Sequence, residues 1–134
     1  MIYTEERVSN KQMDELAERL FPKRGIINLD RNDLEAVLAG NDGVLLSALQ
    51  ENDDGRTFLQ RFFSRLSEIP EMEQARSIMF YFGNSAENPL KMDDLALIGD
   101  FLSQYPDTDC IWGVKMNDEG VGLSAVAVFG VPPA

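Results

Sequence analysis

The chain has 134 residues, the usual size of one domain, and its 44% hydrophobic content excludes a mostly disordered protein. The net charge of −11, from 12 basic and 23 acidic residues, repels phosphate backbones, so we expect no nucleic-acid binding. The sequence has no histidine, the commonest general base. Its single cysteine, Cys110, excludes an intrachain disulfide, and no ligand cluster predicts a metal site.

Residues 1–10 are polar and acidic and lack the basic-then-apolar pattern of a signal peptide. No apolar run approaches the roughly 20 residues that span a bilayer. We therefore expect a cytoplasmic protein with no membrane span, whose residues 1–9 form a flexible lead.

Two short helices are predicted in the first 40 residues. Ser9 and Gln12 have the spacing of a capping box, and the helix that they begin ends near Phe21. A loop over 25–30 then leads into a second helix, with Leu34 on its apolar face and Asn28 or Asp30 as its cap.

From residue 43 the pattern alternates between strand and helix. Strands are predicted over 44–50, 76–82, 110–116 and 121–129, and amphipathic helices over 54–69 and 93–105. The last two strands are joined by residues 117–120, which predict a hairpin and hence an antiparallel pair. The fold class is α/β, an α+β two-layer sandwich: a mixed sheet of about four strands with two helices on one face, preceded by the two short helices.

Few residues in this sequence suggest chemistry. The glycines are scattered singly and form no phosphate-binding loop. Acidic neighbours could divide acid and base roles, but each pair lies where Asp commonly caps a helix or turn. These pairs are Asp53/Asp54, Asp93/Asp94 and Asp107/Asp109. We expect Cys110 to be a buried, inert thiol, and Trp112 and residues 80–82 to belong to the core.

The segment Asn28-Leu-Asp-Arg-Asn-Asp33 combines several unusual features. Asn28 or Asp30 could cap the following helix while Asp33 complements its dipole. Polar side chains at this spacing could instead converge to orient a water molecule, as hydrolytic sites do. The residues alone leave both interpretations open.

The string from Gly25 to Leu38 resembles the synergy loop and following helix of the FtsZ family of tubulin-like GTPases, with the pattern G-[LI]-I-N-x-D-x-x-D-[VL]. Asn28, Asp30 and Asp33 all fall on that pattern. In that family the loop of one subunit completes the GTPase site of its filament neighbour, and its acidic residues polarise the attacking water. The resemblance implies that these three residues could play that part.

The downstream sequence is similar to the C-terminal domain of the same family. Residues 75–79 resemble its strand opening A-[RK]-G-[VI]-L, residues 110–113 its strand ending V-I-x-G, and residues 126–130 its last strand. The helix over 93–103 also fits, so the resemblance covers about residues 13–131. The glycine-rich G-G-G-T-G-T-G phosphate loop of the family does not occur in the printed sequence.

The resemblance implies a stand-alone C-terminal domain of the FtsZ/tubulin family, without the GTP-binding domain. We expect a flexible lead at 1–9, then a core-helix remnant, synergy-like loop and short helix over 10–40, then the FtsZ-like domain over 41–134. The expected function is a non-enzymatic interaction module without cofactor or metal, which docks on full-length FtsZ or another tubulin-like GTPase and modulates its polymerisation or hydrolysis. The expected docking residues are Gly25, Ile26, Ile27, Asn28, Leu29, Asp30 and Asp33.

Two alternatives remain open at this point. The strand and helix order also resembles trimeric chorismate-mutase-like proteins, which build enzyme sites between subunits. Such sites need cationic residues for anionic substrates, and here the basic residues are scattered. The other alternative is a relic domain in which the loop only caps a helix. The sequence does not predict the oligomeric state.

Overall fold

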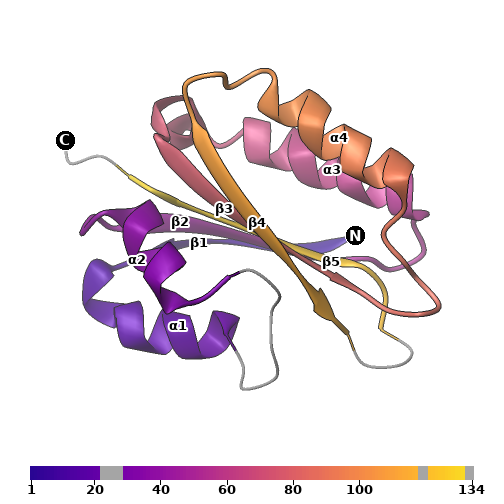
Figure 1. The fold of residues 1–134 in the computed structure, drawn as a ribbon, viewed down its shortest axis with the longest axis horizontal. Helices are drawn as coiled ribbons and strands as arrows, with labels where there is room; N and C mark the ends of the chain where they lie inside the picture. Colours follow the sequence, from indigo (N-terminus) through magenta and orange to yellow (C-terminus); the bar gives the residue numbers. More distant parts are fainter. Residues whose placement is uncertain (22–28, 118–120, 132–134) are drawn as a thin grey trace.

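The computed structural model describes residues 1–21, 29–117 and 121–131. They form a five-stranded mixed sheet with helices on both faces (Figure 1). In chain order the elements are β1 (Ile2–Val8), α1 (Met13–Leu20), α2 (Arg31–Leu38), β2 (Gly43–Leu49), α3 (Gly55–Ser67), β3 (Ser77–Asn84), α4 (Met92–Leu102), β4 (Asp109–Met116) and β5 (Ser124–Gly130). This confirms the predicted α/β class, with one strand more than expected. No helix in the described residues is both long and apolar enough to span a membrane.

The additional strand is β1, which occupies residues that we predicted to be a flexible lead. It pairs antiparallel with β2, from Ile2 opposite Leu49 to Val8 opposite Gly43. The prediction was wrong because β1 is held by partners far along the chain rather than by its own apolar content. The guanidinium of Arg65 on α3 lies 4.9 Å from the centre of the Tyr3 ring.

The predicted hairpin between the last two strands was also wrong. The strand order is β1-β2-β5-β3-β4, so β3 lies between β4 and β5. β5 pairs antiparallel with both β2 and β3, and β4 pairs parallel with β3. A turn-rich connection predicts that the chain reverses direction, but it does not determine which strand becomes the neighbour. β5 has buried residues on both of its faces, which suits a central strand.

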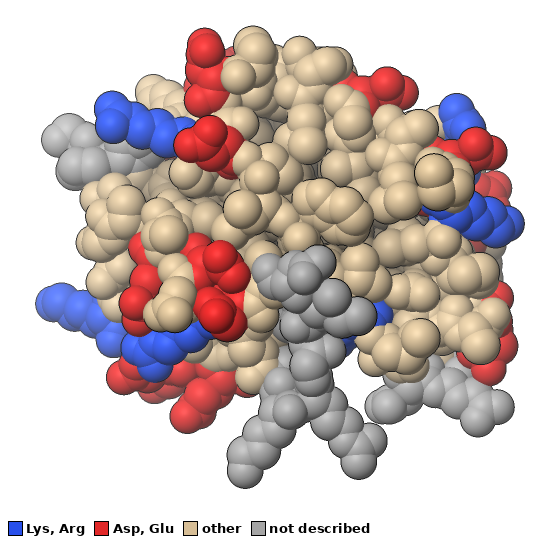
Figure 2. Space-filling model, viewed as in Figure 1, with Lys and Arg blue, Asp and Glu red and all other residues tan. Residues whose placement is uncertain are grey.

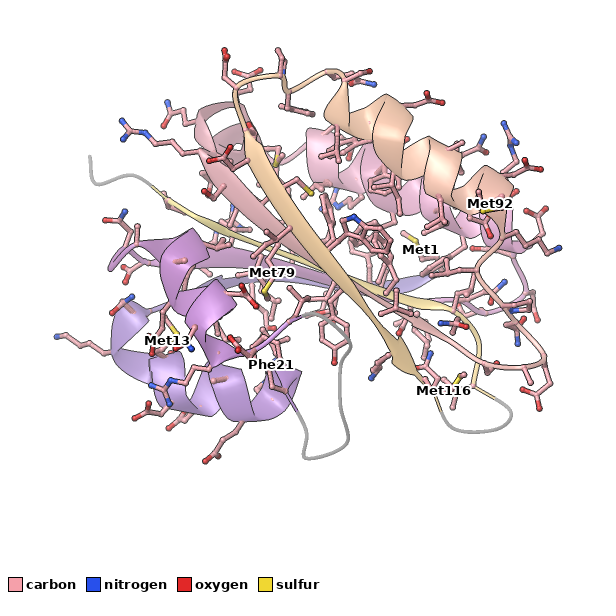
Figure 3. The ribbon with its side chains drawn as sticks, in the orientation of Figure 1. Met1, Met13, Phe21, Met79, Met92 and Met116 are labelled. Atoms are coloured by element: carbon pink, nitrogen blue, oxygen red, sulfur yellow. The ribbon has the colours of Figure 1, made fainter. Side chains whose placement is uncertain are left out.

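The sheet separates two apolar cores. α3 and α4 cover one face, where the core includes Phe62, Phe80, Phe82 and Phe129. α1 and α2 cover part of the other face, where Leu34 packs with side chains that include Leu45, Met79 and Val128. Met13, Phe21 and Met79 lie on this second side of the sheet (Figure 3). The expectation of helices on one face only was therefore incomplete.

The aromatic residues that we expected in the core divide between two environments. Phe80, Tyr81 and Phe82 on β3 are all buried, as predicted. Trp112 on β4 is 43% exposed, so its assignment to the core was wrong. β4 lies at the edge of the sheet, where an apolar side chain has neighbours on fewer sides.

The position of α2 on the sheet depends on a glycine at the end of β5. A Cβ atom added to Gly130 would lie 3.1 Å from the carbonyl oxygens of Val37 and Leu38. We expect Gly130→Ala to lower the free energy of unfolding by about 1–3 kcal/mol, because backbone atoms of α2 must move. Gly99→Ala is the matched control, since a Cβ there meets nothing within 4 Å.

Urea unfolding followed by circular dichroism measures both variants. Gly99 lies inside α4, so its replacement by alanine should raise stability by about 0.5–1 kcal/mol. An unchanged midpoint for Gly130→Ala would contradict the close contact between β5 and α2.

Candidate functional site

The predicted docking segment ends at the start of α2. Gly25, Ile26, Ile27 and Asn28 lie outside the described residues. Leu29 is buried in the core beneath α1 and α2, whereas Asp30 is exposed. The segment is thus anchored by an apolar side chain directly before a carboxylate that faces solvent.

Asp30 and Asp33 are brought together in a capping box. Oδ1 of Asp30 accepts hydrogen bonds from the backbone N–H groups of Asn32 at 2.8 Å and Asp33 at 3.3 Å. In return, Oδ2 of Asp33 accepts from the N–H of Asp30 at 2.8 Å. This confirms Asp30 as one of the two caps that the sequence allowed. Both carboxylates lie at the positive end of the helix dipole, which stabilises their charge.

Arg31 connects α2 to α1, a contact that the sequence analysis missed. Its guanidinium forms ion pairs with Glu35, at 2.9 Å, and with Asp14 on α1. The hydrogen bond to Glu35 and that to Asp14 raise the pKa of Arg31 above its ordinary value. The spacing of Arg31 and Glu35 could have predicted the first pair. Nothing in the sequence indicates the second, because it depends on how the two helices pack.

The outer surface of α1 and α2 carries more acidic than basic side chains. Acidic residues there are Asp14, Glu15, Glu18, Asp30, Asp33 and Glu35, against Arg19 and Arg31. Arg19 is itself paired with Glu6 on β1, at 3.0 Å. Figure 2 shows acidic and basic side chains gathered on this part of the molecule. A surface of this kind favours a basic partner.

Members of two of the other acidic pairs, Asp53/Asp54 and Asp93/Asp94, have structural partners. Asp54 caps α3, and hydrogen bonds from the backbone N–H and hydroxyl of Thr57 lower its pKa. Asp94 is 4% exposed and accepts the N–H of Lys91 at 2.8 Å. Asp53 pairs with Arg61 at 3.1 Å.

Asp54, Asp93 and Asp94 also line one cleft of about 320 Å³ between the starts of α3 and α4. The sequence did not predict that two of the pairs would meet there. Within residues 1–21, 29–117 and 121–131, no group of three His, Cys, Asp or Glu side chains has the arrangement of a metal site.

Cys110 on β4 is half-buried rather than buried as we predicted, and its partial burial raises the pKa of its thiol to about 11. The thiolate is the reactive form, so the structure supports the predicted inert thiol. No described residue offers this thiol an opposite charge that would lower its pKa.

A scan against known protein families finds no match for this sequence, and a search of curated proteins finds none either. Solved structures do match its fold. The GTPγS-form protofilament of TubZ from Bacillus thuringiensis serovar israelensis matches with a TM-score of 0.62 and 13% identity, over 90% of this chain and 33% of TubZ. This is a tubulin/FtsZ-like fold.

Two further structures agree with it. The GDP-form protofilaments of the same TubZ match with a TM-score of 0.62 and 13% identity, over 90% of this chain and 34% of that chain. The empty FtsZ dimer of M. jannaschii matches with a TM-score of 0.54 and 15% identity, over 88% of this chain and 35% of the FtsZ chain. This chain thus spans about a third of the length of the protein chains that it matches. At these identities the likeness concerns the fold alone.

The capping box predicts a specific pattern of stability. We expect Asp30→Ala to cost about 1 kcal/mol of unfolding free energy, and Asp30→Asn no more than a few tenths, because Asn caps as well as Asp. Asp33→Ala should cost roughly 0.5–1 kcal/mol by removing the acceptor for the N–H of Asp30. Urea unfolding measures all three. Equal losses for Asp30→Ala and Asp30→Asn would show that the cap contributes little.

The raised pKa of Cys110 predicts slow alkylation in the folded protein. At pH 8 the folded chain should react with iodoacetamide about a hundredfold more slowly than the chain unfolded in urea, because its thiolate fraction is lower. The rate should then increase with pH until the pH passes about 11. Similar rates for the folded and unfolded chains at pH 8 would contradict the burial of this thiol.

Proposed function

We propose that this chain is a non-enzymatic interaction module that docks on a full-length tubulin-like GTPase and modulates its polymerisation or GTP hydrolysis. The likeness in fold to TubZ and FtsZ over about nine-tenths of the chain carries the proposal. The matched structures are protofilaments of TubZ and a dimer of FtsZ, which are assemblies of like subunits. The order of the sequence motifs, which resembles that of the C-terminal domain of such a protein, also supports the proposal.

The proposed docking segment is Gly25–Asp33, and Asp30 is the residue in it on which the proposed effect on hydrolysis depends. Both capping bonds of Asp30 use Oδ1, and no described residue bonds to Oδ2. Because Asp30 is exposed, Oδ2 can accept a hydrogen bond from a water molecule while the cap at Oδ1 stays intact. The resemblance to the synergy loop implies that Asp30 polarises the water that attacks a partner's nucleotide, and this role belongs to the proposal.

The surrounding surface supports a protein partner of opposite charge. The acidic outer surface of α1 and α2 adjoins the docking segment, and Arg31 is neutralised by Asp14 and Glu35. Charge complementarity of this kind accelerates association and is screened by salt. Docking should therefore weaken as the salt concentration rises.

The basic side chains favour this function over the enzyme alternative. A site for an anionic substrate needs free cations. Arg56 and Lys91 line the cleft that Asp54, Asp93 and Asp94 also line, and five of the seven described arginines are paired with carboxylates. These are Arg7, Arg19, Arg31, Arg61 and Arg65. The relic alternative explains Asp30 and Asp33 as caps only, and the following experiment distinguishes it from docking.

The test compares wild type with Asp30→Asn in assays with full-length FtsZ from the same organism. Asn keeps the cap and removes the carboxylate, so stability is retained. We expect wild type to bind and to change the rate of GTP hydrolysis or the polymer length. Asp30→Asn should still bind but lose at least about tenfold of its effect on hydrolysis.

Asp100→Asn is the matched control, because Asp100 is exposed on α4 in the opposite layer. It should behave like wild type. If wild type changes neither hydrolysis nor polymer length, the docking proposal fails. If wild type and Asp30→Asn act equally on hydrolysis, Asp30 has no role beyond its cap.

A further inference from the structure

β4 forms one edge of the sheet and is apolar along its middle. It pairs with β3 and lies last in the strand order. Between Asp109 and Lys115 the strand reads Cys-Ile-Trp-Gly-Val and carries no charge. In Figure 2 uncharged side chains cover the middle of the molecule, where β4 crosses the face in Figure 1. A long apolar edge of this kind favours pairing with another strand.

The main-chain groups that β4 directs outward can be assigned from its hydrogen bonds. The N–H of Asp109 donates to the carbonyl of Arg76, and that of Asn117 donates to the carbonyl of Asn84. Odd-numbered residues therefore direct their main-chain groups toward β3. Because successive residues of a strand alternate, Cys110, Trp112 and Val114 direct theirs away from the sheet.

We propose that two copies of this chain associate by antiparallel pairing of their β4 edges, centred on Trp112. In this register Trp112 exchanges backbone hydrogen bonds with Trp112 of the second copy, and Cys110 exchanges them with Val114 of the second copy. The outward residues are therefore matched to one another, and a continuous sheet crosses the interface. The proposal does not depend on the proposed function.

The charges of β4 support a second copy as the occupant of this edge. Asp109 and Lys115 are the two charged residues of β4, and they lie equally far from Trp112 along the strand. Centring on Trp112 therefore places Asp109 of each copy opposite Lys115 of the other. Both side chains lie on the face that carries α1 and α2, because their β3 neighbours Ser77 and Gly83 alternate with Phe80 and Phe82. Opposite charges directly across a strand pair stabilise it.

The exposed tryptophan gains a partner in the same register. Trp112 lies beside Phe80 on the face covered by α3 and α4, and it is 43% exposed. At the two-fold axis the two indole rings meet on that face and lose contact with water. Nζ of Lys115 lies 5.4 Å from the centre of the Tyr81 ring. This contact holds the ammonium group on the α1/α2 face.

The test reverses these charges one at a time and then together. Sedimentation equilibrium and tryptophan emission, from about 1 to 300 μM protein, give the dissociation constant; Trp112 is the chain's single tryptophan. We expect wild type to dimerise with a blue shift of emission. Asp109→Lys and Lys115→Glu should each weaken the dimer about tenfold or more, and the double reversal should restore it to within about threefold.

Asp107→Lys is the matched control, because it makes the same charge change just before β4 begins. Asp109→Lys and Asp107→Lys lower the net negative charge equally, so general repulsion between copies decreases in both. If Asp109 contacts the second copy, Asp109→Lys weakens the dimer and Asp107→Lys does not. Circular dichroism and thermal unfolding of each variant exclude loss of fold as the cause.

Carbodiimide cross-linking tests the register in wild type. The reagent joins a carboxylate to an amine with loss of water, and Asp109 and Lys115 of one strand lie roughly 20 Å apart, too far to react. In a mixture of ¹⁴N- and ¹⁵N-labelled protein we expect mixed-isotope Asp109–Lys115 cross-links by mass spectrometry. A wild type that stays monomeric over this range, a double reversal that does not restore pairing, or the lack of this cross-link would overturn the proposal.

Discussion

Strand β5 joins two parts of the sheet that are otherwise separate. β1 and β2 lie on one side of it, β3 and β4 on the other, and its backbone hydrogen bonds to β2 and β3 connect them. Its alternating side chains enter both cores, with Phe129 beneath α3 and α4 and Val128 beneath α1 and α2. Because β5 is the last strand of the sequence, the sheet is complete only after pairings between distant residues have formed.

The same strand determines where residues 29–33, the described part of the candidate docking segment, lie. The close approach of Gly130 to the end of α2 fixes that helix on the sheet, and Leu34 is fully buried there. With its apolar side held in this way, α2 presents the Asp30 carboxylate at its first turn. Residues 29–33 of the docking segment are therefore held in place by the fold, as an electrostatic docking surface requires. The carboxylates of Asp30 and Asp33 both cap the helix and supply its negative charge. A substitution such as Asp30→Asn, which keeps the cap and removes the charge, separates these two roles.

The two proposed contacts, at the start of α2 and at the β4 edge, use different residues and different kinds of interaction. The start of α2 depends on carboxylates, the helix dipole and a basic partner surface. The β4 edge depends on main-chain hydrogen bonds, a tryptophan and two opposite charges arranged symmetrically around it.

The sequence by itself determined the local structure. Helix periodicity, capping residues and apolar runs predicted most helices and strands and named Asp30 as one of two candidate caps, because these signals act within a few residues along the chain. Only the tertiary structure decided the place of β5, the pairing of β1, the exposure of Trp112 and the Arg31–Asp14 contact. Each depends on which distant segment becomes a neighbour, and several segments of the sequence satisfy the same local pattern. Among the possible strand orders, the one observed places β5 at the centre of the sheet, where the burial of both its faces lowers the free energy of the folded state.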